Sequence, residues 1–259
     1  MWRYDGWASE LKLGVVAPHA DVGPEAEMQA MLHALPATVH GARVHFAPMH
    51  PGGTIDEKIA HDPVLRFVDR DVLDIVVGSL SSAPLDVIAL AFTSSSFKLG
   101  ARGEQELLDR LGEVSHEIPL ETTGRAAVAA IRSLGLERVA VMAPSWFDEE
   151  LCRAGMSYFV EQDVDVVSVT PSGPAGGPLA ITAATMSYAV AELVARTGAD
   201  AVLIAGNGQR AVGAIEHLES SLGVTVLTAN QVLLWSALRV SALRGRVEGY
   251  GRLFREGVT

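Results

Sequence analysis

Four consecutive hydroxyl side chains follow directly after a strongly apolar segment, 86–92 (DVIALAF). They belong to Thr93, Ser94, Ser95 and Ser96. Hydroxyls and backbone N–H groups in a turn that leads into a helix can bind a carboxylate without any basic side chain. Ser and Thr are also preferred caps of a helix N-terminus, but a cap needs one of them rather than four. We therefore favour a substrate-binding anion site at Thr93, Ser94 and Ser95.

A second polar turn, Gly206-Asn207-Gly208, follows the apolar segment 200–205. Glycines let the backbone approach a ligand closely, and Asn207 adds one amide side chain. Arg210 either holds a substrate carboxylate or is an exposed arginine of a helix. The run from Gly206 also matches the glycine-rich pattern of dinucleotide-binding turns, but no acidic residue ends the next apolar segment, as that pattern requires. A plain turn before a helix is the simpler alternative to a nucleotide site.

Two groups that can transfer protons lie in the loop after the first apolar segment. A histidine or a carboxylate at a strand end, here His19 and Asp21, can act as acid or base near neutral pH. We take both as candidate catalytic residues, with a structural role as the alternative. Glu25 fits the first turn of a helix, where an acid is favoured. Cys152 falls on the apolar stripe of a predicted helix, and we expect it to be buried and inert.

The elements that must position these residues alternate between strands and helices. Such alternation is typical of a mostly parallel sheet with helices on both faces, and ligands then bind at the carboxyl ends of the strands. The apolar runs predict strands at 13–18, 43–49, 86–92, 138–144, 164–170, 200–205 and 224–228. The helical spacing predicts helices at 25–35, 64–80, 104–114, 122–135, 148–162, 182–197, 210–222 and from near residue 230.

The pattern repeats within the chain. LGVVAP at 13–18 is similar to RVAVMAP at 138–144, and the segment from Asp86 is similar to the segment from Asp200. We therefore predict an α/β fold of two pseudo-symmetric halves, with mostly parallel sheets flanked by helices and a cleft between them. We place residues 1–118 and 224–259 in the first half and residues 119–223 in the second.

Composition limits the classes of partner. The chain carries 20 basic and 31 acidic residues, a net charge of −11, which argues against nucleic acid. No apolar run approaches the roughly 18 to 20 residues that cross a bilayer, and the start lacks the apolar core of a secretion signal. One cysteine excludes an intrachain disulfide and a zinc–cysteine cluster. We expect a cytoplasmic protein without a membrane partner, and its 49% apolar composition is compatible with a homo-oligomer.

As a set, the loop sequences resemble the aspartate/glutamate racemase superfamily, in the branch of maleate cis-trans isomerase and arylmalonate decarboxylase. The resemblance implies two α/β halves with the active site between them, and no cofactor or metal. It also implies that Thr93 and Ser94 stand at carboxylate-binding positions, and that Ser145 replaces a tyrosine that helps to bind the carboxylate. The matching pieces cover nearly the whole chain in order and are GVVAP at 14–18, AFTSSSF at 91–97, APSWFD at 143–148 and TANQVLLW at 228–235.

The sequence departs from this family at its reactive thiols. The family uses cysteines at the ends of two equivalent strands as acid, base or nucleophile beside a carboxylate, and its decarboxylases keep only one. These positions align with Phe92 and Gly206 here, so both thiols are missing. We therefore expect a divergent, cofactor-free isomerase or decarboxylase-like lyase that acts on a small carboxylic acid through His19 or Asp21. A carboxylate-binding protein without catalysis is the alternative, and a nucleotide-dependent oxidoreductase is the third.

Overall fold

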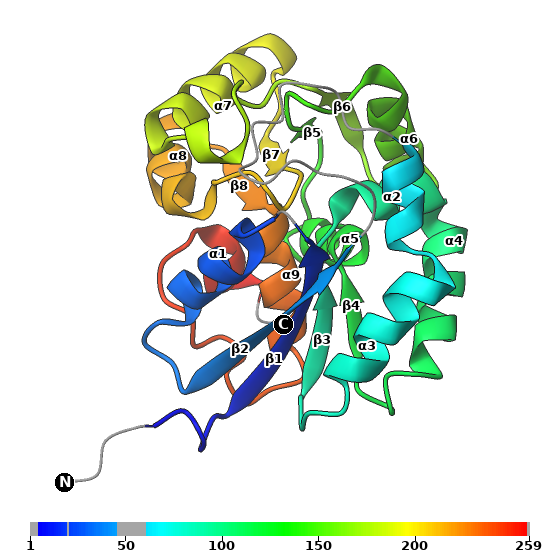
Figure 1. Cartoon of the computed structure of the whole chain (residues 1–259). Helices are drawn as coiled ribbons and strands as arrows, with labels where there is room; N and C mark the ends of the chain where they lie inside the picture. The colour runs from blue at the N-terminus through cyan, green and yellow to red at the C-terminus, as the bar shows by residue number, and fades with distance from the viewer. Residues whose placement is uncertain (1–4, 20, 46–60, 258–259) are drawn as a thin grey trace, which may run out of the picture.

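The structure is a computed structural model that describes residues 5–19, 21–45 and 61–257 (Figure 1). Two four-stranded sheets form its centre, with strand orders β2-β1-β3-β4 and β6-β5-β7-β8, and every paired strand is parallel. The expected α/β fold of two parallel sheets flanked by helices is thereby confirmed. The first sheet contains β1 (Leu11–Pro18), β2 (Ala37–Val44), β3 (Val87–Leu90) and β4 (Leu120–Thr122). The second contains β5 (Val139–Met142), β6 (Val166–Thr170), β7 (Ala201–Ile204) and β8 (Thr225–Thr228).

Helices cover both faces of the sheets, so the inner strands β3, β5 and β7 are buried along their whole length. Strands covered on both faces read as continuous apolar runs rather than alternating ones, which is why the sequence located them well. The helices are α1 (Gly23–Leu32), α2 (His61–Phe67), α3 (Ile75–Leu80), α4 (Thr93–Gly112), α5 (Thr123–Ser133), α6 (Glu149–Val160), α7 (Ala183–Thr197), α8 (Ile215–Leu222), α9 (Ala229–Leu238) and α10 (Arg252–Glu256). No helix in the described ranges is long and apolar enough to cross a membrane.

The internal repeat has a counterpart in strand register. Leu13 of β1 pairs with Val87 of β3, and Val139 of β5 pairs with Ala201 of β7. The two sheets also have the same strand order when each is numbered from its own first strand. Positions 92 and 206, and positions 93 and 207, are therefore equivalent ends of β3 and β7.

Three predicted elements differ from the structure. The helix predicted at 64–80 is divided into α2, a π-helical turn at Arg70–Asp74, and α3. The strand predicted at 43–49 begins earlier, at Ala37, because β2 is a partly exposed edge strand without an apolar run; its residues 46–49 lie outside the described ranges. Helix α4 begins at Thr93 rather than at residue 104 and is interrupted at Gly100, where φ is +69°.

The predicted division of the chain assigned two short strands, β4 and β8, to the wrong sheets. β4 follows residue 118 but pairs with β3 in the first sheet, and β8 follows residue 223 but pairs with β7 in the second. Each is followed at once by a helix, and the two helices, α5 and α9, pack against each other between the sheets (Figure 1). Apolar runs indicate where strands are but not which strands they pair with. The predicted passages of the chain from one half to the other therefore precede these strands, whereas in the structure they follow them.

Candidate active site

The loops after β1, β3, β5 and β7 meet between the two sheets. Thr93 at the end of β3 is bonded to Asn207 at the end of β7. A Cβ atom placed on Gly208 would lie 3.4 Å from Oδ2 of Asp21, in the loop after β1. A Cβ atom placed on Gly206 would overlap the ring of Pro144, at the end of β5. Four strand ends from both sheets thus form one junction.

The four hydroxyl residues after β3 form the buried first turn of α4. Ser95 Oγ donates to the carbonyl oxygen of Phe92 at 2.8 Å, which is a local turn contact. Ser96 Oγ accepts a hydrogen bond from the backbone N–H of Gly124 in α5 at 3.2 Å. These two hydroxyls therefore serve the fold, and Thr93 and Ser94 stand nearest to the start of the helix.

Asn207 is the centre of the polar contacts between the sheets and is 3% exposed. Its Oδ1 accepts hydrogen bonds from the backbone N–H of Thr93 at 2.9 Å and from Thr93 Oγ1 at 2.8 Å. Its Nδ2 donates to Thr123 Oγ1 at 3.1 Å and to Asn230 Oδ1 at 2.9 Å. Since these partners begin α4, α5 and α9, one side chain of the second sheet connects three helix starts.

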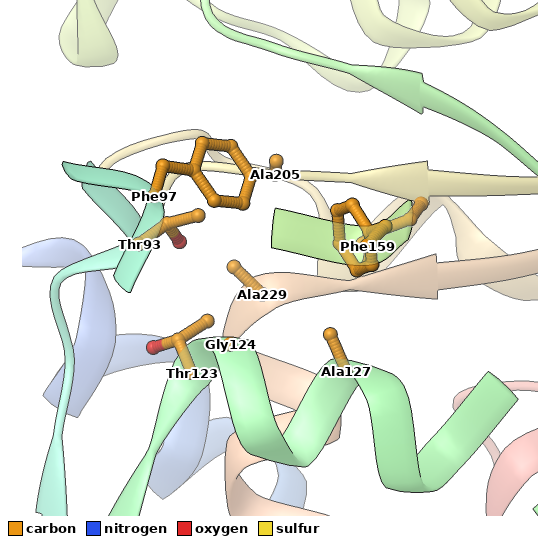
Figure 2. A pocket seen from close by; sticks show the side chains of 9 residues that line it. Thr93, Phe97, Thr123, Gly124, Ala127, Phe159, Ala205 and Ala229 are labelled. Atoms are coloured by element: carbon orange, nitrogen blue, oxygen red, sulfur yellow. The ribbon is translucent and has the colours of Figure 1, made fainter. Parts of the chain in front are cut away.

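A cavity lies beside this junction and has about 10 Å³ of space, room for roughly one water molecule. Figure 2 shows Thr93 and Phe97 beside each other on one side of it, Phe159 across from them, and Thr123 and Ala127 below. Its lining is mostly apolar and consists of Thr93, Phe97, Thr123, Gly124, Ala127, Phe159, Leu203, Ala205 and Ala229. This cavity is too small for a carboxylic acid substrate beside the present side chains.

The two predicted acid–base residues lie in the β1–α1 loop. Asp21 Oδ1 accepts a hydrogen bond from the N–H of Gly23 at 3.0 Å. Burial, reinforced by the nearby carboxylate of Glu25, raises the pKa of Asp21 to about 6. Burial and the neighbouring His45 ring, with centroids 4.5 Å apart, lower the pKa of His19. Asp21 therefore exchanges its proton close to neutral pH, and His19 favours the neutral form.

Glu27 is a buried acid of α1 that sequence reasoning missed. Its Oε1 accepts hydrogen bonds from the backbone N–H groups of Ala211 at 2.7 Å and Val212 at 3.0 Å, and its Oε2 accepts one from Asn230 Nδ2 at 2.8 Å. Burial raises the pKa of this carboxyl group despite the three donors. The signal was its place one turn before Met31 on the apolar face of the helix. Glu27 fixes the loop after β7 from the opposite sheet.

Two predicted substrate-binding residues, Ser145 and Arg210, are not among the hydrogen-bond partners of Thr93 and Asn207 named above. Ser145 Oγ donates to the carbonyl oxygen of Pro174 at 3.0 Å, in a loop of the second sheet. Arg210 is exposed at the end of the loop after β7. Cys152 is buried in α6, as expected. The structure thus brings Asp21, Thr93 and the Gly206–Gly208 turn together, and it places Arg210 at the surface.

The two positions where the sequence resemblance predicts the family's thiols hold residues of different kinds. The ring of Phe92 packs against that of Phe67 in α2, with centroids 4.8 Å apart. The backbone of Gly206 has φ +84°, a conformation that residues other than glycine rarely adopt. A Cβ atom at this position would also have no room beside Pro144. Neither position can supply a proton.

A charged cluster that the sequence did not reveal joins α2, α4 and α6. His61 Nε2 lies 2.7 Å from Asp148 Oδ2, and Lys98 Nζ lies 2.9 Å from His61 Nδ1 and 3.0 Å from Glu150 Oε1. Although burial opposes it, the bonds from Leu151 N–H and His61 lower the pKa of Asp148. His61 and Asp148 of this cluster are 87 residues apart in the chain, so no sequence motif marked the cluster.

The same architecture, two parallel sheets flanked by helices, is found in solved structures of a maleate isomerase and an arylmalonate decarboxylase. A family model described as arylmalonate decarboxylase matches residues 64–254. The chain belongs to the arylmalonate decarboxylase family. An arylmalonate decarboxylase of Bordetella bronchiseptica is 28% identical over 174 residues, which cover 66% of this chain and 71% of the relative.

Solved structures agree on the fold. A maleate isomerase of Pseudomonas putida with maleate has a TM-score of 0.79 at 22% identity, covering 95% of this chain and 98% of the other. An arylmalonate decarboxylase structure has a TM-score of 0.74 at 23% identity, with 95% and 99% covered. A maleate cis-trans isomerase of Nocardia farcinica, with a covalently bound succinylcysteine intermediate, has a TM-score of 0.77 at 20% identity, with 95% and 98% covered. The family match over residues 64–254 confirms the expected branch of the superfamily, and these structures agree with it in fold.

Proposed function

We propose that this protein isomerises or decarboxylates a small carboxylic acid without a cofactor and without a cysteine, using Asp21 as the proton-transferring group. The observation that carries the proposal is the position of Asp21, whose Oδ2 faces Gly208 in the turn that follows the strand end at Gly206. A carboxyl group with a pKa of about 6 can give or take a proton at physiological pH. Asp21 thus offers the acid–base function that Gly206 lacks.

The substrate carboxylate is assigned to the start of α4. A carboxylate that leaves water must recover its hydrogen bonds, or its transfer costs several kcal/mol. Thr93 supplies a backbone N–H and a hydroxyl at this helix start, and Ser94 is the next buried hydroxyl residue. Relatives named for maleate and for arylmalonates make dicarboxylic acids the first substrates to test.

The chemistry of a malonate illustrates the role of Asp21. Loss of carbon dioxide leaves an electron pair on the carbon beside the remaining carboxylate, and that carbon must receive one proton. In this proposal the acid form of Asp21 donates the proton and is then reprotonated from solvent. His19, two residues earlier, is the second candidate: its imidazolium form would donate the proton, and the lowered pKa of the ring makes that form scarce at neutral pH.

A carboxylate-binding protein without catalysis is the competing function. The observation that favours it is that the two strand ends which hold thiols in the family hold Phe92 and Gly206 here. Both functions share the anion site at Thr93, and they differ in whether Asp21 transfers a proton.

The test is turnover of maleate, phenylmalonate and related acids by the purified protein, followed by NMR in deuterated buffer. We expect Asp21→Asn to lower kcat by about 10²- to 10⁴-fold, the usual contribution of a general acid or base. If the acid form of Asp21 is required, kcat of the original protein falls as pH rises above about 6, and the variant lacks this dependence. Glu113→Gln, at an exposed residue of the α4 end, is the matched control. Binding without turnover in the original protein would establish the competing function.

A further inference from the structure

We propose that the side chain of Asn207 is an internal occupant of the carboxylate site, so that a ligand carboxylate binds only after this side chain has turned away. The inference rests on the proposed function in one respect, since it takes Thr93 as the residue that receives the carboxylate. It gives Asn207 a different role from direct binding of the substrate.

The hydrogen bonds of Thr93 are the first observation. Its backbone N–H and its hydroxyl both donate to Asn207 Oδ1, at 2.9 and 2.8 Å. The hydroxyl oxygen also accepts from the backbone N–H of Gly206 at 3.2 Å. A hydroxyl has a single proton, so Thr93 has no donor left for a second acceptor. The carboxamide oxygen takes the place that one carboxylate oxygen of a ligand would take.

The available space is the second observation. Asn207 and Thr93 are 3% and 4% exposed. The cavity beside them holds about 10 Å³, enough for roughly one water molecule (Figure 2). Among the described residues there is therefore no room for a ligand carboxylate to bind the N–H and hydroxyl of Thr93 while the Asn207 carboxamide is bound to them.

No side chain of an adjacent residue restricts rotation of the Asn207 side chain. Gly206 has φ +84°, and Gly208 follows directly, so Asn207 lies between two residues without side chains. Turning away would break the contacts of Nδ2 with Thr123 and Asn230. A ligand carboxylate would replace the contacts of Asn207 Oδ1 but not those of Nδ2, so most molecules keep the side chain turned in. The apparent affinity for the ligand is then the intrinsic affinity multiplied by the fraction of molecules in which the side chain has turned away.

The position of Asn207 in the repeat explains how it reaches the site. Residue 93 ends β3 and residue 207 ends β7, and the strand registers make these positions equivalent. Equivalent residues of the two sheets face each other across the junction. One of them supplies the donors, and the other supplies an acceptor with the geometry of a carboxylate oxygen.

The experiment compares Asn207→Ala and Asn207→Ser with the original protein for maleate and malonate binding by isothermal titration calorimetry. We expect the dissociation constant to fall at least tenfold in both variants, and the double variant Asn207→Ala with Thr93→Val to lose the gain. Circular dichroism and urea unfolding establish that each variant is folded, and the serine variant serves if the alanine variant is not. Unchanged or weaker binding by a folded variant overturns the proposal, since a residue that binds substrate directly must lose affinity when truncated.

The outcome is separable from the proposed function. If Asn207→Ala gains affinity but neither protein turns over any acid, the internal occupant stands and catalysis through Asp21 fails. If the original protein turns over its substrate and Asn207→Ala has unchanged affinity and KM, the catalytic proposal stands and the internal occupant fails. If no folded variant binds either acid, the internal occupant is likewise overturned.

Discussion

The ends of β3 and β7 are equivalent in the repeat, yet the chain leaves them in different ways. After β3, α4 begins at once at Thr93, and Ser95 bonds back to Phe92 within the first turn. After β7, the backbone takes a positive φ at Gly206 and passes through a loop before α8. Glu27, in helix α1 beside the first sheet, accepts hydrogen bonds from that loop. The first strand end is bonded partly within its own turn and partly to Asn207, and the second depends on a carboxylate of α1.

At the two positions where the resemblance predicts thiols, different physical features therefore bear on a cysteine side chain. At residue 92 the side chain is large and packs against Phe67, while the backbone is ordinary. At residue 206 the backbone conformation and Pro144 exclude a side chain altogether. A thiol is therefore compatible with the first strand end and incompatible with the second.

The largest expected effect comes from placing a thiol at each end. We expect Gly206→Cys to lower the free energy of unfolding by about 3 to 5 kcal/mol, from a strained positive φ and overlap with Pro144. Phe92→Cys removes only a partly buried ring, and we expect it to cost about 2 kcal/mol. Urea unfolding of the two variants side by side measures the difference. Equal stability of the two variants would contradict the claim that backbone conformation and Pro144 exclude a side chain at residue 206.

Removing the carboxylate that holds the β7 loop tests its dependence on the opposite sheet. We expect Glu27→Ala to cost about 3 kcal/mol, because it leaves the N–H groups of Ala211 and Val212 and one of the two N–H groups of the Asn230 amide without their acceptor. Glu27→Gln keeps an oxygen acceptor and should cost less than half as much. Hydrogen exchange at Ala211 and Val212 reports whether the loop has opened, and protection that stays at the original level in the alanine variant would contradict this account.

Asp21 gives a smaller, pH-dependent effect at the same junction. Its pKa is raised from 3.8 to about 6, so the folded protein binds the proton more tightly than the unfolded chain. The stability that Asp21 contributes is therefore complete below about pH 4 and is lost as pH rises through 6. Relative to Asp21→Asn, the free energy of unfolding should fall by up to about 3 kcal/mol between pH 4 and pH 7. Parallel urea titrations check this, and a difference that stays constant with pH would place Asp21 in a solvated position.

The equivalent of Asp21 in the second sheet sharpens the comparison. The register that matches Leu13 with Val139 also matches Asp21 with Phe147. Phe147 packs edge-on against Phe97 in α4, with centroids 6.5 Å apart, while Asp21 faces the turn after β7. The junction thus has an aromatic side and an ionisable side, and the proposed chemistry belongs to the ionisable one.

The sequence predicted the buried strands and the meeting of their ends, because these depend on apolar runs and on the repeat. It missed the start of α4, since a run of Thr and Ser has low helix propensity and is typical of a turn. In the structure those residues are held by partners in other elements, such as Gly124 and Asn207. Local preference was overridden by contacts that are distant in the chain.

Contacts of this kind also explain what the sequence could not show in the candidate site. The pairing of Thr93 with Asn207 spans 114 residues, and that of Glu27 with Val212 spans 185. Each residue type was visible in the sequence, but its partner was not. A carboxylate site and an amide that fills it look alike until the two sheets are brought together.

The packing of α5 against α9 has a consequence for the synthesis of this protein. Helix α5 ends at Ser133, and α9, which also contacts α1 and β3, is complete only at Leu238. At 5 to 20 residues per second, a ribosome needs roughly 5 to 20 s to add the 105 residues between these points. During that time the nascent chain exposes the apolar surfaces that α9 later covers. Until α9 has been synthesised, the surfaces of α5, α1 and β3 that it contacts stay uncovered, so the two sheets complete their packing only after residue 238 has been added.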